Sequence, residues 1–230
     1  MSKHLERDLQ KLERGVLTLG ATVEEQINAA IQSLLWRRVD VATQVTEVDE
    51  QIDEREVELE EECLKVLALY QPVAGDLRYI ITVLKVNNIL ERMGDQASNI
   101  ARCAIDQAKL PPLPDMPAVQ EITDRVRGMV RNCLDALIQK NADLARDVLL
   151  QDDEVDRANH QIYSRLESRM AESPELIPQS LHMIIASKNL ERIGDLATNI
   201  AEDVVFLVEG EIIRHRYATS VVHGSNGNHS

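Results

Sequence analysis

The chain has 230 residues, and its 25 Lys and Arg against 39 Asp and Glu give a formal net charge of −14. This acidity argues against a general nucleic-acid binder, which needs a basic surface to neutralise phosphates, and the 3% of aromatic residues provides no stacking platform for single strands. Few glycines and prolines among abundant helix-forming residues exclude a collagen, a disordered tail protein and a β-sandwich.

The first half of the chain predicts three helices. Apolar residues recur at spacings of three and four from Leu5 to Leu34, which indicates an amphipathic helix of about 30 residues. Asp40 is then expected to cap a second helix, which ends at Pro72 because proline disfavours a helical residue before it. A third helix is expected from about residue 75 to residue 107. The single Trp36, at the end of the first helix, is expected to be a packing residue.

The second half repeats this order after a break. Residues 109–117 hold four of the seven prolines and predict a linker. Helices are then expected at 117–140, from an Asn141 cap to about residue 172, and from about Ser173-Pro174 to a left-handed cap at Gly210. We therefore expect a first three-helix repeat at 1–108, a linker at 109–116, a second repeat at 117–213 and a disordered tail at 214–230.

Two segments show that the halves are an internal repeat. Residues 90–101 (LERMGDQASNIA) and 190–201 (LERIGDLATNIA) are identical at nine of twelve positions. Asp49 and Asp53 recur as Asp152 and Asp156. A repeat of about 100 residues with three helices each predicts an all-α fold of two tandem antiparallel three-helix bundles.

Acidic residues are repeated along with the apolar ones. At about 100° per residue, Glu91, Asp95 and Asn99 fall on one side of the third helix, beside the apolar stripe, and near the surface. A D-x-x-x-D helix packed against an E-x-x-x-D helix supplies four oxygen ligands of the kind that Mg, Mn, Ca or Fe prefers. The candidate metal ligands are Asp49, Asp53, Glu91, Asp95, Asp152, Asp156, Glu191 and Asp195. The alternative is a solvated acidic face that pairs with Arg92 and Arg192. Gly94 and Gly194, inside the repeated motif, indicate close approach of a neighbouring helix.

The doubled L-E-R-[IM]-G-D motif, with Gln71-Pro72 and Asp76-Leu77-Arg78 in the first repeat, resembles the PhoU family over residues 3–216. The second repeat lacks the Q-P-x-A-x-D-L-R segment, so the two bundles are not equivalent at that end. The resemblance implies a cytoplasmic, non-enzymatic regulator of phosphate uptake that also restrains the phosphate-starvation response. Its implied partners are the ATP-binding subunit of a phosphate ABC transporter and a phosphate-sensing histidine kinase. We also expect no nucleic-acid partner, no membrane span and a homodimer.

The same resemblance implies metal clusters of Fe, Mn, Zn or Mg on the eight carboxylates, with Asn99 and Asn199 as outer ligands. Two alternatives stay open. A carboxylate-ligated metalloenzyme would need histidine or further carboxylates in a buried site, and neither repeat contains Glu-x-x-His. A metal-free helical scaffold would keep the same acidic residues as solubilising surface.

Overall fold

The computed structural model describes residues 3–114 and 116–213, and this part of the chain contains helices and no strands. The predicted disordered tail at 214–230 lies outside the described residues. The helices are α1 (Lys3–Trp36), α2 (Val39–Tyr70), α3 (Ala74–Ala108), α4 (Pro117–Gln139), α5 (Ala142–Leu149), α6 (Asp152–Glu172) and α7 (Ile177–Glu209), with a 3₁₀ turn at Pro174–Leu176 before α7. None of these helices is long and apolar enough to cross a membrane.

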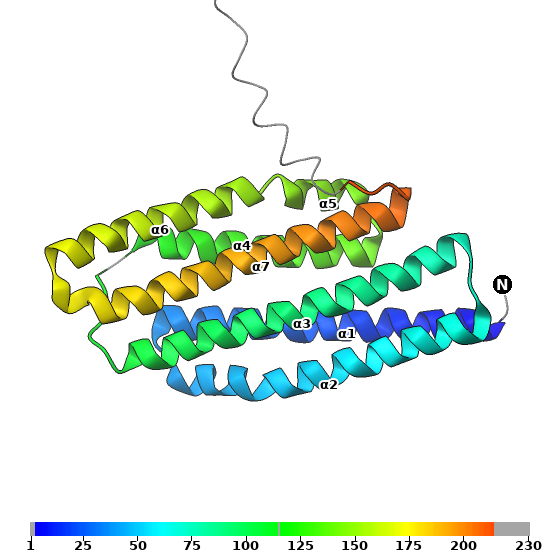
Figure 1. Ribbon diagram of the computed structural model, residues 1–230, viewed down its shortest axis with the longest axis horizontal. Coiled ribbons are helices and arrows are strands. Elements are labelled where there is room, and N and C mark those ends of the chain that lie inside the picture. Colours follow the sequence, from blue (N-terminus) through cyan, green and yellow to red (C-terminus); the bar gives the residue numbers. More distant parts are fainter. Residues whose placement is uncertain (1–2, 115, 214–230) are drawn as a thin grey trace, which may run out of the picture.

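The helices form two antiparallel bundles that lie side by side. The first bundle consists of α1, α2 and α3, and the second consists of α4 to α7 (Figure 1). The two bundles meet along α3 and α7, and α1 also packs against α4. The all-α fold of two repeated bundles is therefore confirmed.

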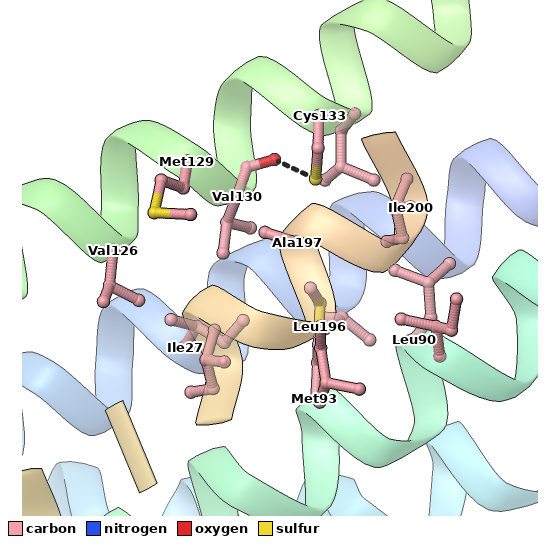
Figure 2. Packing of buried hydrophobic residues seen from close by; sticks show 14 of the residues in the cluster. Ile27, Leu90, Met93, Val126, Met129, Val130, Cys133, Leu196, Ala197 and Ile200 are labelled. Atoms are coloured by element: carbon pink, nitrogen blue, oxygen red, sulfur yellow. Dashed lines mark hydrogen bonds between the residues drawn. The ribbon is translucent and has the colours of Figure 1, made fainter. Parts of the chain in front are cut away.

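Both bundles share one continuous hydrophobic core. Near its centre, Ile27 of α1 and Met93 of α3 lie opposite Met129 of α4 and Leu196 of α7 (Figure 2). A fully buried Leu or Ile side chain contributes about 1.5–3 kcal/mol through apolar area removed from water. Because residues of both repeats fill this region, neither repeat completes its core without the other.

The three cysteines lie in this core as free thiols. Cys133 donates a hydrogen bond from its sulfhydryl to the carbonyl of Val130, at 3.1 Å (Figure 2). Burial raises the pKa of Cys63 to about 12, so this thiol stays protonated at neutral pH. The cysteines are therefore packing residues and not nucleophiles.

Two predicted helix ends are confirmed. The side chain of Asn141 accepts hydrogen bonds from the backbone N–H groups of Asp143 and Leu144, both at 3.1 Å, at the start of α5. Gly210 ends α7 in the left-handed region, with φ 78°, and its N–H donates to the carbonyl of Phe206. Both residues satisfy backbone groups that a helix end leaves without intrahelical partners.

Two other predictions of helix ends were wrong. Asp40 does not cap α2, because the helix already begins at Val39 and the guanidinium of Arg38 binds the Asp40 carboxylate. The helix expected to run from Asn141 to about residue 172 is interrupted at Leu150, whose side chain is 69% exposed. Arg146 holds α5 to Glu209 of α7, and α6 then begins with three acidic residues, which favour the positive N-terminal end of a helix.

Trp36 was also wrongly predicted to pack, since 64% of its surface is exposed. The reason lies in the next residue. Arg37 adopts a left-handed conformation, with φ 55°, and its guanidinium donates to the carbonyl of Ala108, the last residue of α3, and to that of Leu110 just after it. This link fixes the turn between α1 and α2 and leaves the indole outside the core.

An ion pair joins the two bundles across α3 and α7. Lys85 Nζ lies 2.8 Å from Asp203 Oδ1, and only 4% of Asp203 is exposed. The same ammonium lies 4.9 Å from the centre of the Phe206 ring. At the equivalent positions of the opposite repeats, the chain has Ile185 and Cys103 instead. The pair is therefore specific to one half of the interface.

Replacing Gly128 by alanine is expected to stabilise the protein by about 1 kcal/mol, because glycine costs about that much inside a helix. A Cβ there would meet no atom within 4 Å. Gly94→Ala is the matched contrast: its Cβ would lie 3.2 Å from Gln26 Oε1 and 3.3 Å from Ile52 Cδ1, so overpacking offsets the same gain. Urea unfolding of both variants checks this, and an equal gain in the two would contradict it.

Candidate metal centres

The first group of predicted ligands lies where α2 packs against α3. Asp49 and Asp53 come from α2, and Glu91 and Asp95 come from α3. Asp49 and Glu91 are half-buried, whereas Asp53 and Asp95 are exposed. We call these four carboxylates the first acid face. Their position beside the core agrees with the angular argument from the sequence.

The second group lies where α6 packs against α7, and we call it the second acid face. Asp152 and Asp156 come from α6, and Glu191 and Asp195 come from α7. The pattern of burial is the same, with Asp152 and Glu191 half-buried and the other two exposed. The internal repeat therefore extends from the sequence to the placement of all eight carboxylates.

The glycines of the repeated motif allow the helices beneath these faces to approach closely, as predicted. A Cβ at Gly94 would press on Gln26 and Ile52, and a Cβ at Gly194 would lie 3.4 Å from Val155 Cγ1 of α6. Close approach of α6 to α7 brings the backbone positions of Asp152 and Asp195 toward one another. The glycines are therefore part of what positions the acidic residues.

Burial and then the charges of neighbouring carboxylates raise the pKa of Glu91, Asp95, Asp152, Asp156 and Asp195. For Asp152, burial and then the charges of Asp195 and Asp156 raise the pKa from 3.8 to about 6. Burial and then the charge of Asp95 raise the pKa of Glu91 above its usual value. Such mutual repulsion places negative charge where a cation would stabilise it. Each face is therefore electrostatically prepared for a positively charged ligand.

Arg92 and Arg192, the cations expected from the sequence, lie close enough for their charges to offset part of the rise in the pKa of Glu91 and Asp195, but the ion pairs of the two faces involve other cations. Arg102 lies 3.8 Å from Asp49 and donates a hydrogen bond to Asn99 Oδ1 at 2.9 Å. Lys188 forms an ion pair with Glu191. The sequence prediction therefore named Arg92 and Arg192 but missed the ion-paired Arg102 and Lys188. The spacing of three residues from Asn99 to Arg102, and from Lys188 to Glu191, is the signal that could have found them.

The two predicted outer ligands also differ. Asn99 is engaged by Arg102, as described above. Asn199 instead lines a groove of about 440 Å³ between α3 and α7, together with Asn88 and Arg92. The two repeats are therefore alike in their four carboxylates and unlike in the amides one turn away.

The donor atoms of each face fit hard cations, because all four are carboxylate oxygens. Their arrangement does not form a closed coordination shell. Among residues 3–114 and 116–213, no three Asp, Glu, His or Cys side chains are placed so that they could hold one metal ion together. Binding of a metal at either face would therefore require the carboxylates to move closer together.

The contribution of Asp152 to the free energy of unfolding is expected to be lost as the pH rises from about 4 to about 7 in the presence of a chelator. The folded protein binds the Asp152 proton more tightly than the unfolded chain does, so ionisation costs stability as the pH passes 6. Asp152→Asn is expected to reduce this dependence. Urea unfolding at several pH values measures it, and equal slopes in both proteins would rule out the effect.

Comparison with known proteins identifies the repeat. The family model described as "PhoU domain" matches residues 16–104 and 119–204. A phosphate-specific transport system accessory protein PhoU homolog from Pseudomonas putida is 41% identical over 94% of this chain and 84% of its own length. One from Aquifex aeolicus is 37% identical over 92% and 96%. The crystal structure of PhoU from Pseudomonas aeruginosa covers 90% of this chain and 99% of its own, with a TM-score of 0.87 and 40% identity.

Proposed function

The chain belongs to the PhoU family, and from this premise we propose that it is a regulator of phosphate uptake and not an enzyme. The observation that carries the proposal is the match of both repeats to the family model, together with relatives whose names describe accessory proteins of phosphate-specific transport. The described residues also contain a packed helical core and buried, protonated cysteines, which suits a binding protein better than a catalyst.

The proposed partners are the ATP-binding subunit of a phosphate ABC transporter and a phosphate-sensing histidine kinase. Through them the protein would limit transport and restrain the phosphate-starvation response when phosphate is abundant. A net charge of −14 disfavours direct contact with an anionic membrane surface. We propose that the protein is cytoplasmic and reaches the membrane only through these partners. The homodimer expected from the sequence stays a prediction.

We also propose that the two acid faces hold Fe, Mn, Zn or Mg ions. The four carboxylates of each face would supply the ligands, and the bound cations would neutralise the charges that raise the pKa of Asp152 and Glu91. A metalloenzyme is less well supported, because no Glu-x-x-His motif accompanies either face. A metal-free scaffold is the remaining alternative, and metal analysis decides between it and the proposal.

Deletion of the gene in its own organism tests the regulatory role. With phosphate abundant, a reporter of the phosphate-starvation response is expected to rise about tenfold or more, and a plasmid copy of the gene is expected to restore repression. The purified protein is also expected to bind the purified ATP-binding subunit. Unchanged reporter activity in the deletion strain, together with no binding to that subunit, would refute the proposed function.

A further inference from the structure

The outer side of α2 carries an unusual combination of side chains. Of the 32 residues of α2, eleven are acidic and two are basic, so this helix holds most of the net charge of the chain. At about 100° per residue, nine of its residues fall within an arc of about 80° on the side opposite the buried Ile52: Val39, Thr43, Thr46, Glu50, Glu54, Val57, Glu61, Leu64 and Ala68. We call the five residues in the middle of this row the α2 ridge: Glu50, Glu54, Val57, Glu61 and Leu64.

The ridge is unpartnered within the protein. Val57 is 53% exposed and Leu64 is 52% exposed. Glu50, Glu54 and Glu61 form no hydrogen bond or ion pair with other side chains in the described part of the chain. Glu50 and Glu54 are also four residues apart, a spacing at which like charges destabilise a helix. The ridge therefore combines repulsive charges with two apolar side chains that water solvates poorly.

The repeat shows that the fold does not require this pattern. The positions equivalent to the ridge lie on α6, 103 residues later in the chain. They are Asp153, Arg157, His160, Ser164 and Glu167. Both apolar residues of the ridge are thus replaced by polar ones, and two of its three acids by a cation and a serine. A merely solubilising surface would look like this α6 face, with mixed charges and no large apolar residue.

We propose that the α2 ridge is a docking surface for an amphipathic helix of a partner protein that carries Lys or Arg beside an apolar stripe. Val57 and Leu64 are seven residues apart, two helical turns, which suits the apolar stripe of a second helix packed along α2. The three glutamates would pair with the basic residues of that helix. The groove on the α1 side of α2 borders the ridge at Glu61 and is less suitable, because Lys11, Arg14 and Arg55 also line it.

The inference goes beyond the proposed function, since it names the chemistry of a contact and uses none of the eight candidate metal ligands. Charge complementarity selects the partner. A basic helix is attracted along the ridge, whereas an acidic or neutral helix would leave three glutamates beside its apolar contact. The opposing basic charges would also relieve the repulsion between Glu50 and Glu54.

The test uses a dye-labelled 14-residue peptide with leucines at spacings of three and four and lysines elsewhere. Fluorescence anisotropy measures its binding to the full chain. The triple variant Glu50→Gln, Glu54→Gln, Glu61→Gln is expected to weaken binding tenfold or more. The matched control Glu167→Gln, Glu172→Gln, Glu175→Gln removes the same charge from exposed positions near the end of α6, and is expected to weaken binding less than threefold.

A second variant tests the apolar part without changing charge. Val57→Ser with Leu64→Ser is expected to weaken peptide binding about tenfold, while circular dichroism confirms that the variant is folded. If the two Glu→Gln triple variants weaken binding equally, the peptide is attracted only by the overall negative charge of the protein. If the serine variant binds the peptide as tightly as the wild type, Val57 and Leu64 make no apolar contact with it. Either result overturns the inference, and neither changes the phosphate-response test of the proposed function.

Discussion

Replacing Asp95 and Asp195 together by asparagine is expected to remove most of the metal that we propose the two acid faces bind. The change takes one of four carboxylates from each acid face and leaves a neutral amide of the same size. Changes to groups around a metal typically cost 10–100-fold in affinity, so we expect a loss of tenfold or more here. Elemental analysis of protein purified without chelator, and again after reconstitution with Fe, Mn, Zn or Mg, measures the loss.

The free energy of unfolding of the same variant gives a second measurement. Its expected change has opposite signs with chelator and with metal. Burial and the charge of Glu191 raise the pKa of Asp195, so in chelator the asparagine variant is expected to be more stable than the wild type at pH 7. With metal added, the wild type is expected to gain stability and the variant to gain little. Glu167→Gln with Glu175→Gln is the control for charge alone. A wild type that holds no metal even after reconstitution would return the acid faces to solvated surface.

Replacing Lys85 by methionine is expected to destabilise the protein by about 2 kcal/mol. The change removes the ammonium that lies 2.8 Å from the nearly buried Asp203, and a hydrogen bond to a charged group typically contributes about 1.5–3 kcal/mol. Lys109→Met is the matched control, because its pair with Asp106 is well exposed and is expected to contribute less than about 1 kcal/mol. Urea unfolding at pH 7 compares the two.

The residues at the equivalent positions of the opposite repeats suggest a double substitution that restores the stability lost in the Lys85 variant. Since the equivalent positions hold Ile185 and Cys103, an apolar pair is compatible with this kind of helix contact. Lys85→Ile with Asp203→Ala is therefore expected to recover most of the lost stability, because no buried charge remains. If the double variant is as unstable as the sum of its single variants, the pair does not act as a unit and the explanation is wrong.

Local signals explain which parts of the fold could be predicted from the sequence. The side chain of Asn141 and the missing side chain of Gly210 each act within a few residues, so their roles are readable without knowledge of the rest of the chain. The repeated motif around Glu91 and Glu191 likewise showed that the helices follow the same order in both halves of the chain. The carboxylate positions followed because spacing along a helix fixes angle around it.

The failures arose where distant segments decide the local structure. Trp36 is exposed because Arg37 binds carbonyls more than 70 residues away in the chain. The break at Leu150 has neither glycine nor proline to announce it, and depends on the contact of Arg146 with α7. Arg38 likewise competes for the Asp40 carboxylate, and propensity rules for caps do not include such a neighbour.

The shared core between α3 and α7 also bears on ancestry. α3 is the last helix of the first bundle and α7 is the last helix of the second, so the two helices are equivalent in the repeat. They pack against each other (Figure 1). A half-length chain with one repeat would leave this apolar side uncovered, and a second copy related by a two-fold axis could cover it. Duplication and fusion of such a gene would make the former subunit interface intramolecular, after which the two halves could diverge independently, as Lys85 and Ile185 have done.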